Sequence, residues 1–233
     1  MEKHGYKDLA HIYDRVNQNK DYIKETDFLE RILNKEDVKT VLDVGCGTGN
    51  HMQILEKRGF KCDGIDINQE MLDIARKKVK GELTQADMAN FELNRKYDAI
   101  VSLFASFNHL KNLEKAEKAL KCFKEHLNKE GILVIDLHNP KGNGEKHEKF
   151  EDIERKMKWK YNPETKIEHT KVTFKIKGRT IEDAHTMRIY SIKEMKSLLE
   201  KTGFSMQKAY ENFSFNPASS ESKNIQVLAK AKK

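Results

Sequence analysis

Three glycines and two acidic residues carry the clearest chemical signal in this sequence. Gly45, Gly47 and Gly49 follow a G-x-G-x-G spacing, Asp43 precedes them, and Asp66 stands 21 positions beyond Gly45. Glycines let a backbone turn tightly and let a ligand approach the main chain. A carboxylate at this spacing accepts hydrogen bonds from ribose hydroxyls in dinucleotide sites. The pattern therefore indicates a loop that binds a molecule containing a nucleoside.

Strands and helices that could position this loop alternate along the chain. Continuous apolar runs are typical of buried strands, and when they alternate with helices they indicate a parallel sheet covered on both faces. Strands are predicted at 40–44, 62–67, 82–85, 97–103, 132–137, 204–210 and 224–231. Helices are predicted over 8–35, from the glycine loop to about 58, after Asn68, over 112–128 and from Ser191.

Residues 138–190 are too long for an ordinary connection. Val172, Phe174 and Ile176 alternate with Lys or Thr, which predicts a half-exposed strand, and Lys177-Gly178 predicts a turn into the next one. Trp159 and Tyr161 indicate another strand before these two, which ends at Asn162-Pro163. We predict one domain formed by residues 1–137 and 191–233, with an N-terminal helical segment and with 138–190 inserted as a small antiparallel β cap.

The glycine loop and its flanks resemble a known family. Residues 41–49 resemble motif I of class I S-adenosylmethionine-dependent methyltransferases, and 64–68, 85–88 and 101–106 resemble motifs II, the adenine-contacting turn and motif IV. The G-x-G-x-G spacing differs from that of nicotinamide enzymes, which seat a pyrophosphate at a helix N-terminus; S-adenosylmethionine has no phosphate. The resemblance covers nearly the whole chain and implies a three-layer, Rossmann-like α/β fold. Its seven strands would follow the order 3-2-1-4-5-7-6, with strand 7 antiparallel.

The resemblance also implies a set of contacts to S-adenosylmethionine. Asp66 would hold the ribose hydroxyls, Met71 would lie near the adenine, Asp87 would accept from its exocyclic amine, and Met88 would offer its backbone. The full expected set is Tyr13, Asp43, Gly45, Cys46, Gly47, Gly49, Asp66, Ile67, Met71, Asp87, Met88, Leu103 and Phe104. Other roles remain open: Asp43 could satisfy backbone donors, Asp87 could shape a turn, and Tyr13 could pack a helix.

Within this family, the chain is similar to N-methyltransferases of nucleotide-linked amino sugars. The features that support this are Tyr13-Asp14 ahead of Asp21-Tyr22, the segment 103–110, and Asp183-x-His185 before Tyr190. The chain departs from those enzymes after strand five, where His138-Asn139-Pro140-Lys141 stands in place of aromatic residues. The likeness implies a small-molecule acceptor, and the inserted cap would cover the acceptor site.

Methylation of an amine requires a group that removes its proton. Histidine can do so near physiological pH, so His138 and His185 are the candidate bases, with Tyr13 as a positioning group. His109 is a further candidate lining residue at the carboxyl edge of the sheet. The other histidines are expected at the surface: His4, His11, His51, His126, His147 and His169. No cluster of metal ligands is evident in the sequence, so we expect a metal-free site.

The formal charge of +7 keeps an RNA-directed methyltransferase open as an alternative. The lysines are scattered among nearly as many acids, and Leu103-Phe104-Ala105-Ser106 lacks the Asn/Asp-Pro-Pro-aromatic motif usual in nucleic-acid amino-group methyltransferases. A non-catalytic protein that binds S-adenosylmethionine is the second alternative. The glycine spacing disfavours a nicotinamide oxidoreductase.

The cysteines, the apolar runs and the first ten residues together lead to an expectation for the cellular location. The three cysteines form no C-x-x-C pair, no apolar run could span a bilayer, and residues 1–10 lack the apolar core of a signal peptide. We expect a soluble, cytoplasmic protein with no membrane partner, present as a monomer or homodimer.

Overall fold

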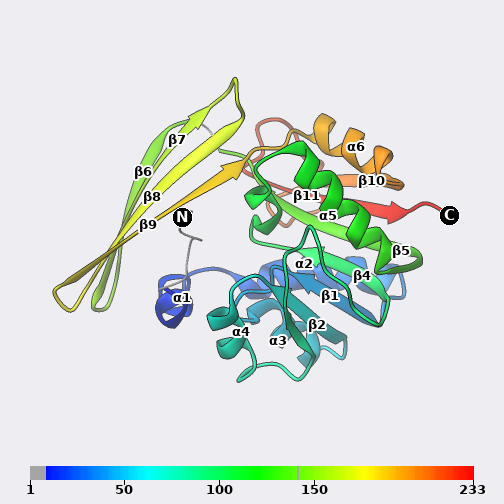
Figure 1. Ribbon diagram of the computed structural model, residues 1–233, viewed down its shortest axis with the longest axis horizontal. Coiled ribbons are helices and arrows are strands. Elements are labelled where there is room, and N and C mark those ends of the chain that lie inside the picture. The colour runs from blue at the N-terminus through cyan, green and yellow to red at the C-terminus, as the bar shows by residue number, and fades with distance from the viewer. Residues whose placement is uncertain (1–8, 141) are drawn as a thin grey trace.

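A seven-stranded sheet forms the centre of the computed structural model, which describes residues 9–140 and 142–233 (Figure 1). The strand order is β10-β11-β5-β4-β1-β2-β3, and β11 runs antiparallel to β5. This is the order predicted from the sequence, since β11 and β10 are the seventh and sixth strands of that sheet. The strands are β1 (Thr40–Val44), β2 (Lys61–Asp66), β3 (Leu83–Gln85), β4 (Tyr97–Ser102), β5 (Leu127–His138), β10 (Phe204–Glu211) and β11 (Asn224–Ala231).

Helices cover both faces of this sheet because successive strand residues point to opposite faces. Leu42 packs in one core cluster with α5 (Leu113–Glu125) and α6 (Ile192–Lys201). Val41 packs in the other with α2 (Tyr22–Lys35), α3 (Asn50–Lys57) and α4 (Gln69–Ala75). The short 3₁₀ helix η1 (Ser106–His109) follows β4. The three-layer architecture is therefore confirmed.

The N-terminal segment differs from the single helical stretch predicted over 8–35, whose first residue lies outside the described part. The structure has α1 (Ala10–Val16), a break, and then α2. Asp21 causes the new start, because its side chain accepts a hydrogen bond from the Lys24 amide at 2.9 Å and so caps α2. The predicted capping box of α6, formed by Ser191 and Glu194, is confirmed.

A separate four-stranded antiparallel sheet follows β5, and we call it the cap sheet. Its strands, in the order β6-β7-β8-β9, are β6 (Gly144–Phe150), β7 (Ile153–Asn162), β8 (Ile167–Ile176) and β9 (Arg179–Arg188). The sequence predicted the last three but not β6, whose Lys, Glu and His residues carry no apolar alternation. Figure 1 shows the cap sheet projecting from the edge of the main fold, with α1 beside it.

α1 joins the cap sheet to the main fold. Ile12 and Val16 of α1 share a buried apolar cluster with Phe150, Val172 and Phe174 of the cap sheet. Since a sheet with one apolar face must bury it, α1 supplies the surface that the cap sheet lacks. Arg15 adds ion pairs to Asp152 and Glu151 at the β6–β7 turn.

Among the described residues, no helix is long and apolar enough to cross a bilayer. This finding agrees with the absence of long apolar runs in the sequence.

The α1–cap seam yields a stability prediction. Ile12→Ala removes a buried side chain from this seam and should lower the local free energy of opening by about 2–5 kcal/mol. Amide hydrogen exchange should therefore accelerate in α1 and β6–β9, while β1 and β4 stay protected. The matched control is His11→Ala, an exposed neighbour on the same helix. Equal protection in Ile12→Ala and His11→Ala would contradict this account of the seam.

Candidate functional site: a cavity between the glycine loop and the cap sheet

One continuous cavity of ≈ 1030 Å³ lies at the carboxyl ends of β1, β2, β4 and β5 and extends under the cap sheet. Ligands of open α/β sheets bind at this edge. The residues predicted from sequence that line it are Tyr13, Asp43, Gly45, Cys46, Gly47, Asp66, Ile67, Met71, Asp87, Met88, Leu103, Phe104, His109, His138 and His185. Gly49 is not among the lining residues; it begins α3, and a Cβ there would lie 3.2 Å from Ala75 Cβ.

The glycine loop turns sharply out of β1. The amides of Gly45 and Cys46 both donate to the Ile65 carbonyl, at 2.8 and 3.0 Å, which folds the loop back onto β2. Gly45 has φ +81°, and a Cβ there would lie 2.7 Å from the Ser106 side chain, so a larger residue would clash with the segment after β4. The Gly47 amide donates to Asp66 Oδ2 at 2.8 Å. The loop and the Asp66 carboxylate are thus positioned by each other.

Asp43 is a buried carboxyl with unsatisfied hydrogen-bonding capacity. It is 2% exposed, and its Oδ1 has no hydrogen-bond partner in the described part of the chain. Burial, with a further contribution from the charge of Asp66, raises the pKa of Asp43 to about 7. Burial also raises the pKa of Asp66, although backbone amides of Asn68, Gly47 and Ile67 partly offset that effect. This end of the cavity therefore presents two acceptors and disfavours another anion.

Apolar side chains flank the two carboxyls. Ile67 is 53% exposed and Phe104 is 43% exposed although both are large and apolar, and both line the cavity. Met71 and Met88 line the same region. Asp87 shapes the turn beside them, since its Oδ1 accepts from the Ala89 amide at 2.9 Å. Apolar surface next to a carboxylate suits a nucleoside, which has a flat base and a sugar with hydroxyl groups.

α1 closes one side of the cavity. Tyr13 lines it, and the neighbouring Asp14 accepts from Thr48 Oγ1 at 2.6 Å and from Asn50 Nδ2 at 3.0 Å. Lys78, which follows α4, pairs with the same carboxylate. A carboxylate of the chain itself therefore occupies the start of α3, where a nicotinamide enzyme would seat its pyrophosphate.

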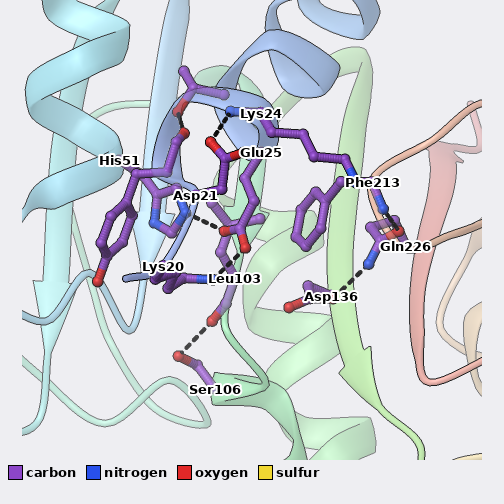
Figure 2. A network of polar contacts seen from close by, with 12 residues as sticks. Lys20, Asp21, Lys24, Glu25, His51, Leu103, Ser106, Asp136, Phe213 and Gln226 are labelled. Carbon is purple, nitrogen blue, oxygen red and sulfur yellow. Dashed lines mark hydrogen bonds and ion pairs between the residues drawn. The ribbon is translucent and has the colours of Figure 1, made fainter. Parts of the chain in front are cut away.

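A polar network that sequence reasoning missed forms another wall (Figure 2). Glu25 pairs with Lys20 and with His51, whose Nε2 lies 2.7 Å from Glu25 Oε2. Burial would raise the pKa of Glu25, but these two partners lower it below its usual value. Asp136, near the end of β5, accepts from Gln226 Nε2 at 2.7 Å. The sequence contained one sign of this network: Asp136 is a single acidic residue within an apolar strand.

The expected surface position of two histidines was wrong. His51 is 7% exposed and lines the cavity. His126 is also buried, with Nδ1 2.8 Å from the Cys122 carbonyl and Nε2 accepting from the Leu93 amide at 3.0 Å. His51 lies on the short helix α3 and His126 directly follows α5, and the partners that bury them leave no local pattern in the sequence. His4 lies outside the described residues.

Three histidines meet at the cap end of the cavity. The His109 and His185 ring centroids are 5.7 Å apart, and desolvation lowers the pKa of both rings. His138 Nε2 lies 3.4 Å from Glu168 Oε2 of β8. Asn108 holds the His138 backbone: its Oδ1 accepts from the His138 amide at 3.0 Å, and its Nδ2 donates to the His138 carbonyl at 3.3 Å. The structure therefore brings together the candidate bases of β5 and β9 with His109 of η1, which was predicted to line the pocket.

The residues present fit S-adenosylmethionine better than a dinucleotide. The unsatisfied Asp43 oxygen suits a cationic donor such as the amino group of a methionine tail. Asp66 suits ribose hydroxyls, and the exposed Ile67 and Phe104 suit an apolar base. The two neighbouring carboxyls would repel a pyrophosphate.

Comparison with known proteins agrees with this site. The sequence model of a family described as a methyltransferase domain matches residues 16–209. The chain is 34% identical over 134 residues to dTDP-3-amino-3,4,6-trideoxy-alpha-D-glucopyranose N,N-dimethyltransferase of Streptomyces venezuelae, covering 55% of this chain and 56% of that protein. The chain thus spans about half the length of the sugar methyltransferases it matches.

Two further relatives match over their whole length. Putative methyltransferase YqeM of Bacillus subtilis is 26% identical over 243 residues, covering 98% of each chain. The crystal structure of a S-adenosylmethionine-dependent methyltransferase from Clostridium acetobutylicum superposes with a TM-score of 0.86 at 22% identity, over 98% of this chain and 99% of that one. The chain belongs to the methyltransferase domain family. Within it, the strand order and glycine loop are those of the class I fold, whose cofactor is S-adenosylmethionine.

The buried Asp43 yields a prediction for stability against pH. Its carboxyl binds a proton more tightly in the folded than in the unfolded state, so its contribution to stability is complete below its ordinary pKa of 3.8 and is lost as pH rises through about 7. The free energy of unfolding of Asp43→Asn minus that of wild type should therefore increase with pH by up to about 4 kcal/mol and level off above neutrality.

Urea unfolding of the ligand-free proteins at several pH values measures this difference. The control is Asp73→Asn, an exposed carboxyl of α4 that pairs with Arg76, for which the difference from wild type should not rise with pH. If the difference between Asp43→Asn and wild type does not change with pH, ionisation of the Asp43 carboxyl costs the folded protein no stability.

Proposed function

We propose that this protein transfers a methyl group from S-adenosylmethionine to the amino group of a small molecule. The observation that carries the proposal is the single cavity that joins the Asp43–Asp66 end to the three histidines under the cap sheet. A donor and an acceptor bound at the two ends would meet inside one chamber of the protein. The similar Streptomyces venezuelae protein is named for methylating a dTDP-linked amino sugar, which supports an acceptor of that class.

We assign the cofactor contacts as follows. Asp66 holds the ribose hydroxyls, Asp43 and the backbone of the glycine loop hold the methionine tail, and Asp87 with the Met88 backbone reads the adenine edge. The remaining contacts are Tyr13, Cys46, Ile67, Met71, Leu103 and Phe104, all of which line the cavity. When bound, the cofactor supplies an activated methyl group on a sulfonium sulfur.

The chain's own contribution is alignment, water exclusion and proton removal. A nucleophile must lie near 3 Å from the methyl carbon and in line with the bond that breaks, and a covered cavity can hold it there. An amine must be neutral to attack, so His138 or His185 accepts its proton, and Tyr13 orients it. We infer that the segment 138–190 acts as the cap over the acceptor.

The cap sheet offers aromatic surface for such an acceptor. Trp159 of β7 lines the cavity and is partly exposed, whereas Phe150 and Phe174 border it but are buried against α1. Trp159 supplies an aromatic contact that the segment 138–141 lacks. Because the acceptor end lies beneath a sheet, a small molecule fits it better than an RNA duplex. We further propose a cytoplasmic monomer or homodimer, in keeping with three buried, unpaired cysteines.

The cofactor assignment predicts a binding defect in Asp66→Ala. The change removes the acceptor for the ribose hydroxyls and the partner of the Gly47 amide, so affinity for S-adenosylmethionine and its demethylated product should fall by about 10- to 100-fold. Isothermal calorimetry measures both ligands, with NAD as a ligand expected not to bind. Asp73→Ala is the control variant. Failure of the wild type to bind either ligand would refute the function.

The proton-removal step predicts a loss of turnover in His138→Ala. With dTDP-3-amino-3,4,6-trideoxy-alpha-D-glucopyranose as the first of a panel of primary amines, kcat should fall by about 100-fold or more. His185→Ala and Tyr13→Phe should give smaller losses, and His169→Ala, an exposed residue of the cap sheet, should give none. If His138→Ala, His185→Ala and Tyr13→Phe all have the kcat of wild type, the proposed roles in proton removal and amine orientation are wrong.

A further inference from the structure

Glu168 of β8 is a buried carboxylate that no cofactor contact uses. It is 2% exposed and lines the cavity. Its Oε1 accepts from Thr170 Oγ1 at 3.1 Å. Its Oε2 has no hydrogen-bond partner within the described ranges, although His138 Nε2 lies 3.4 Å away. One oxygen is thus held in place while the other remains available.

Within the described residues, two carboxylates that line the cavity have an oxygen without a hydrogen-bond partner: Asp43 at the glycine-loop end and Glu168 at the cap end. The carboxylates between them are partnered. Glu148 is paired with Arg155 and Lys146. Glu25 is paired with Lys20 and His51, and Asp136 accepts from Gln226. In the part of the chain that the structure describes, Glu168 has no lysine or arginine ion pair. An ionised carboxylate out of water requires a cationic or hydrogen-bonding partner, which a ligand can supply.

The groups around Glu168 are weak bases rather than permanent cations. His138 approaches from β5, and His185 of β9 is close enough to interact electrostatically with Glu168, His138 and Asp183. His109 of η1 adjoins His185 and is influenced by Lys111. On β7, Tyr161 is the backbone partner of Glu168. An incoming cation would therefore meet the Glu168 carboxylate and imidazole rings, with Asp183 as a second negative charge and Lys111 as a positive charge further away.

We propose that Glu168 binds the amino group of the acceptor as an ammonium ion and directs its proton to His138, an inference that rests on the proposed function. The ammonium nitrogen donates to Glu168 Oε2. One N–H bond of the ammonium breaks, and the proton forms a new N–H bond at His138 Nε2. The nitrogen retains the electron pair with which it attacks, and the imidazolium lies beside the Glu168 carboxylate, which stabilises its charge.

Glu168 and His138 belong to two different sheets, and contacts between those sheets hold the two side chains together. Asn108 bonds to the His138 backbone and also donates to the Arg188 carbonyl at 2.7 Å, so it links the end of β5 to the last residue of β9. β9 pairs with β8 through a register that places Met187 opposite Glu168. The separation of Glu168 from His138 is therefore set by Asn108 and by the β8–β9 ladder.

The test compares an amine with an alcohol of the same shape. Benzylamine and benzyl alcohol are titrated into protein saturated with S-adenosylhomocysteine, so that only the acceptor end is open, and binding is followed by ligand-observed NMR at about neutral pH. Wild type should bind benzylammonium about tenfold more tightly than benzyl alcohol. Glu168→Gln, which keeps the side-chain volume, should lose that preference without weaker binding of the alcohol.

The matched control is Glu182→Gln. Glu182 is an exposed carboxylate of β9 opposite Thr173, on the other face of the cap sheet, and the variant should keep the preference for the amine. Thermal unfolding of both variants checks that the fold is intact. An unchanged amine preference in Glu168→Gln, or none in wild type, would overturn the proposal.

Kinetics with an amine that the protein methylates distinguish the proposed amine site from the proposed methyltransferase function. Glu168→Gln should raise KM for the amine by about tenfold, because the ammonium loses its acceptor at Oε2. Binding of the amine through Glu168 without methylation of any amine would refute the proposed function and retain the amine site. Methylation that is equally efficient in Glu168→Gln would refute the amine site and retain the function.

Discussion

The apolar face of the cap sheet must be buried, and the remainder of the site depends on how this is achieved. Phe150, Val172 and Phe174 find their cover on α1 rather than on the main fold. Since α1 also carries Tyr13 into the cavity and Asp14 to the start of α3, one apolar contact positions the cap sheet, the N-terminal segment and the loop region together. The cavity is thus bordered by the cap sheet, by α1 and by the loops of the main sheet.

Charge is distributed along the cavity in a way that matches a two-substrate reaction. At one end, Asp43 and Asp66 lie near enough for the charge of Asp66 to raise the pKa of Asp43, which suits hydroxyl and cationic donors and excludes phosphate. At the other end, histidines with lowered pKa values lie near Glu168. Between them, Lys20 neutralises Glu25. Each end is therefore complementary to a different chemical group, and neither needs a permanent cation from the chain.

Local sequence patterns predicted the main sheet and its glycine loop well and the cap sheet only in part. Asp43, Gly45 and Asp66 were found because a strand and the loop that follows it are contiguous in sequence. β6 was missed because its residues are polar on both faces, and the break before α2 was missed because Asp21 caps a helix within a polar stretch. Glu168 shares the two-residue periodicity of Val172 and Phe174, so extending that strand backward by two steps would have placed it on the same face.

By itself the sequence determined the alternating α/β fold class and the loop that suits a nucleoside cofactor, whereas the strand order was implied by the resemblance to class I methyltransferases. These features depend on residues close together in the chain, where periodicity and spacing translate directly into geometry. Only the tertiary structure decided the acceptor end, because His138, His185 and Glu168 come from strands of two different sheets and meet only when β8, β9 and η1 pack together. The burial of His51 and the unsatisfied oxygen of Glu168 likewise arise from neighbours far along the chain, which no local pattern specifies.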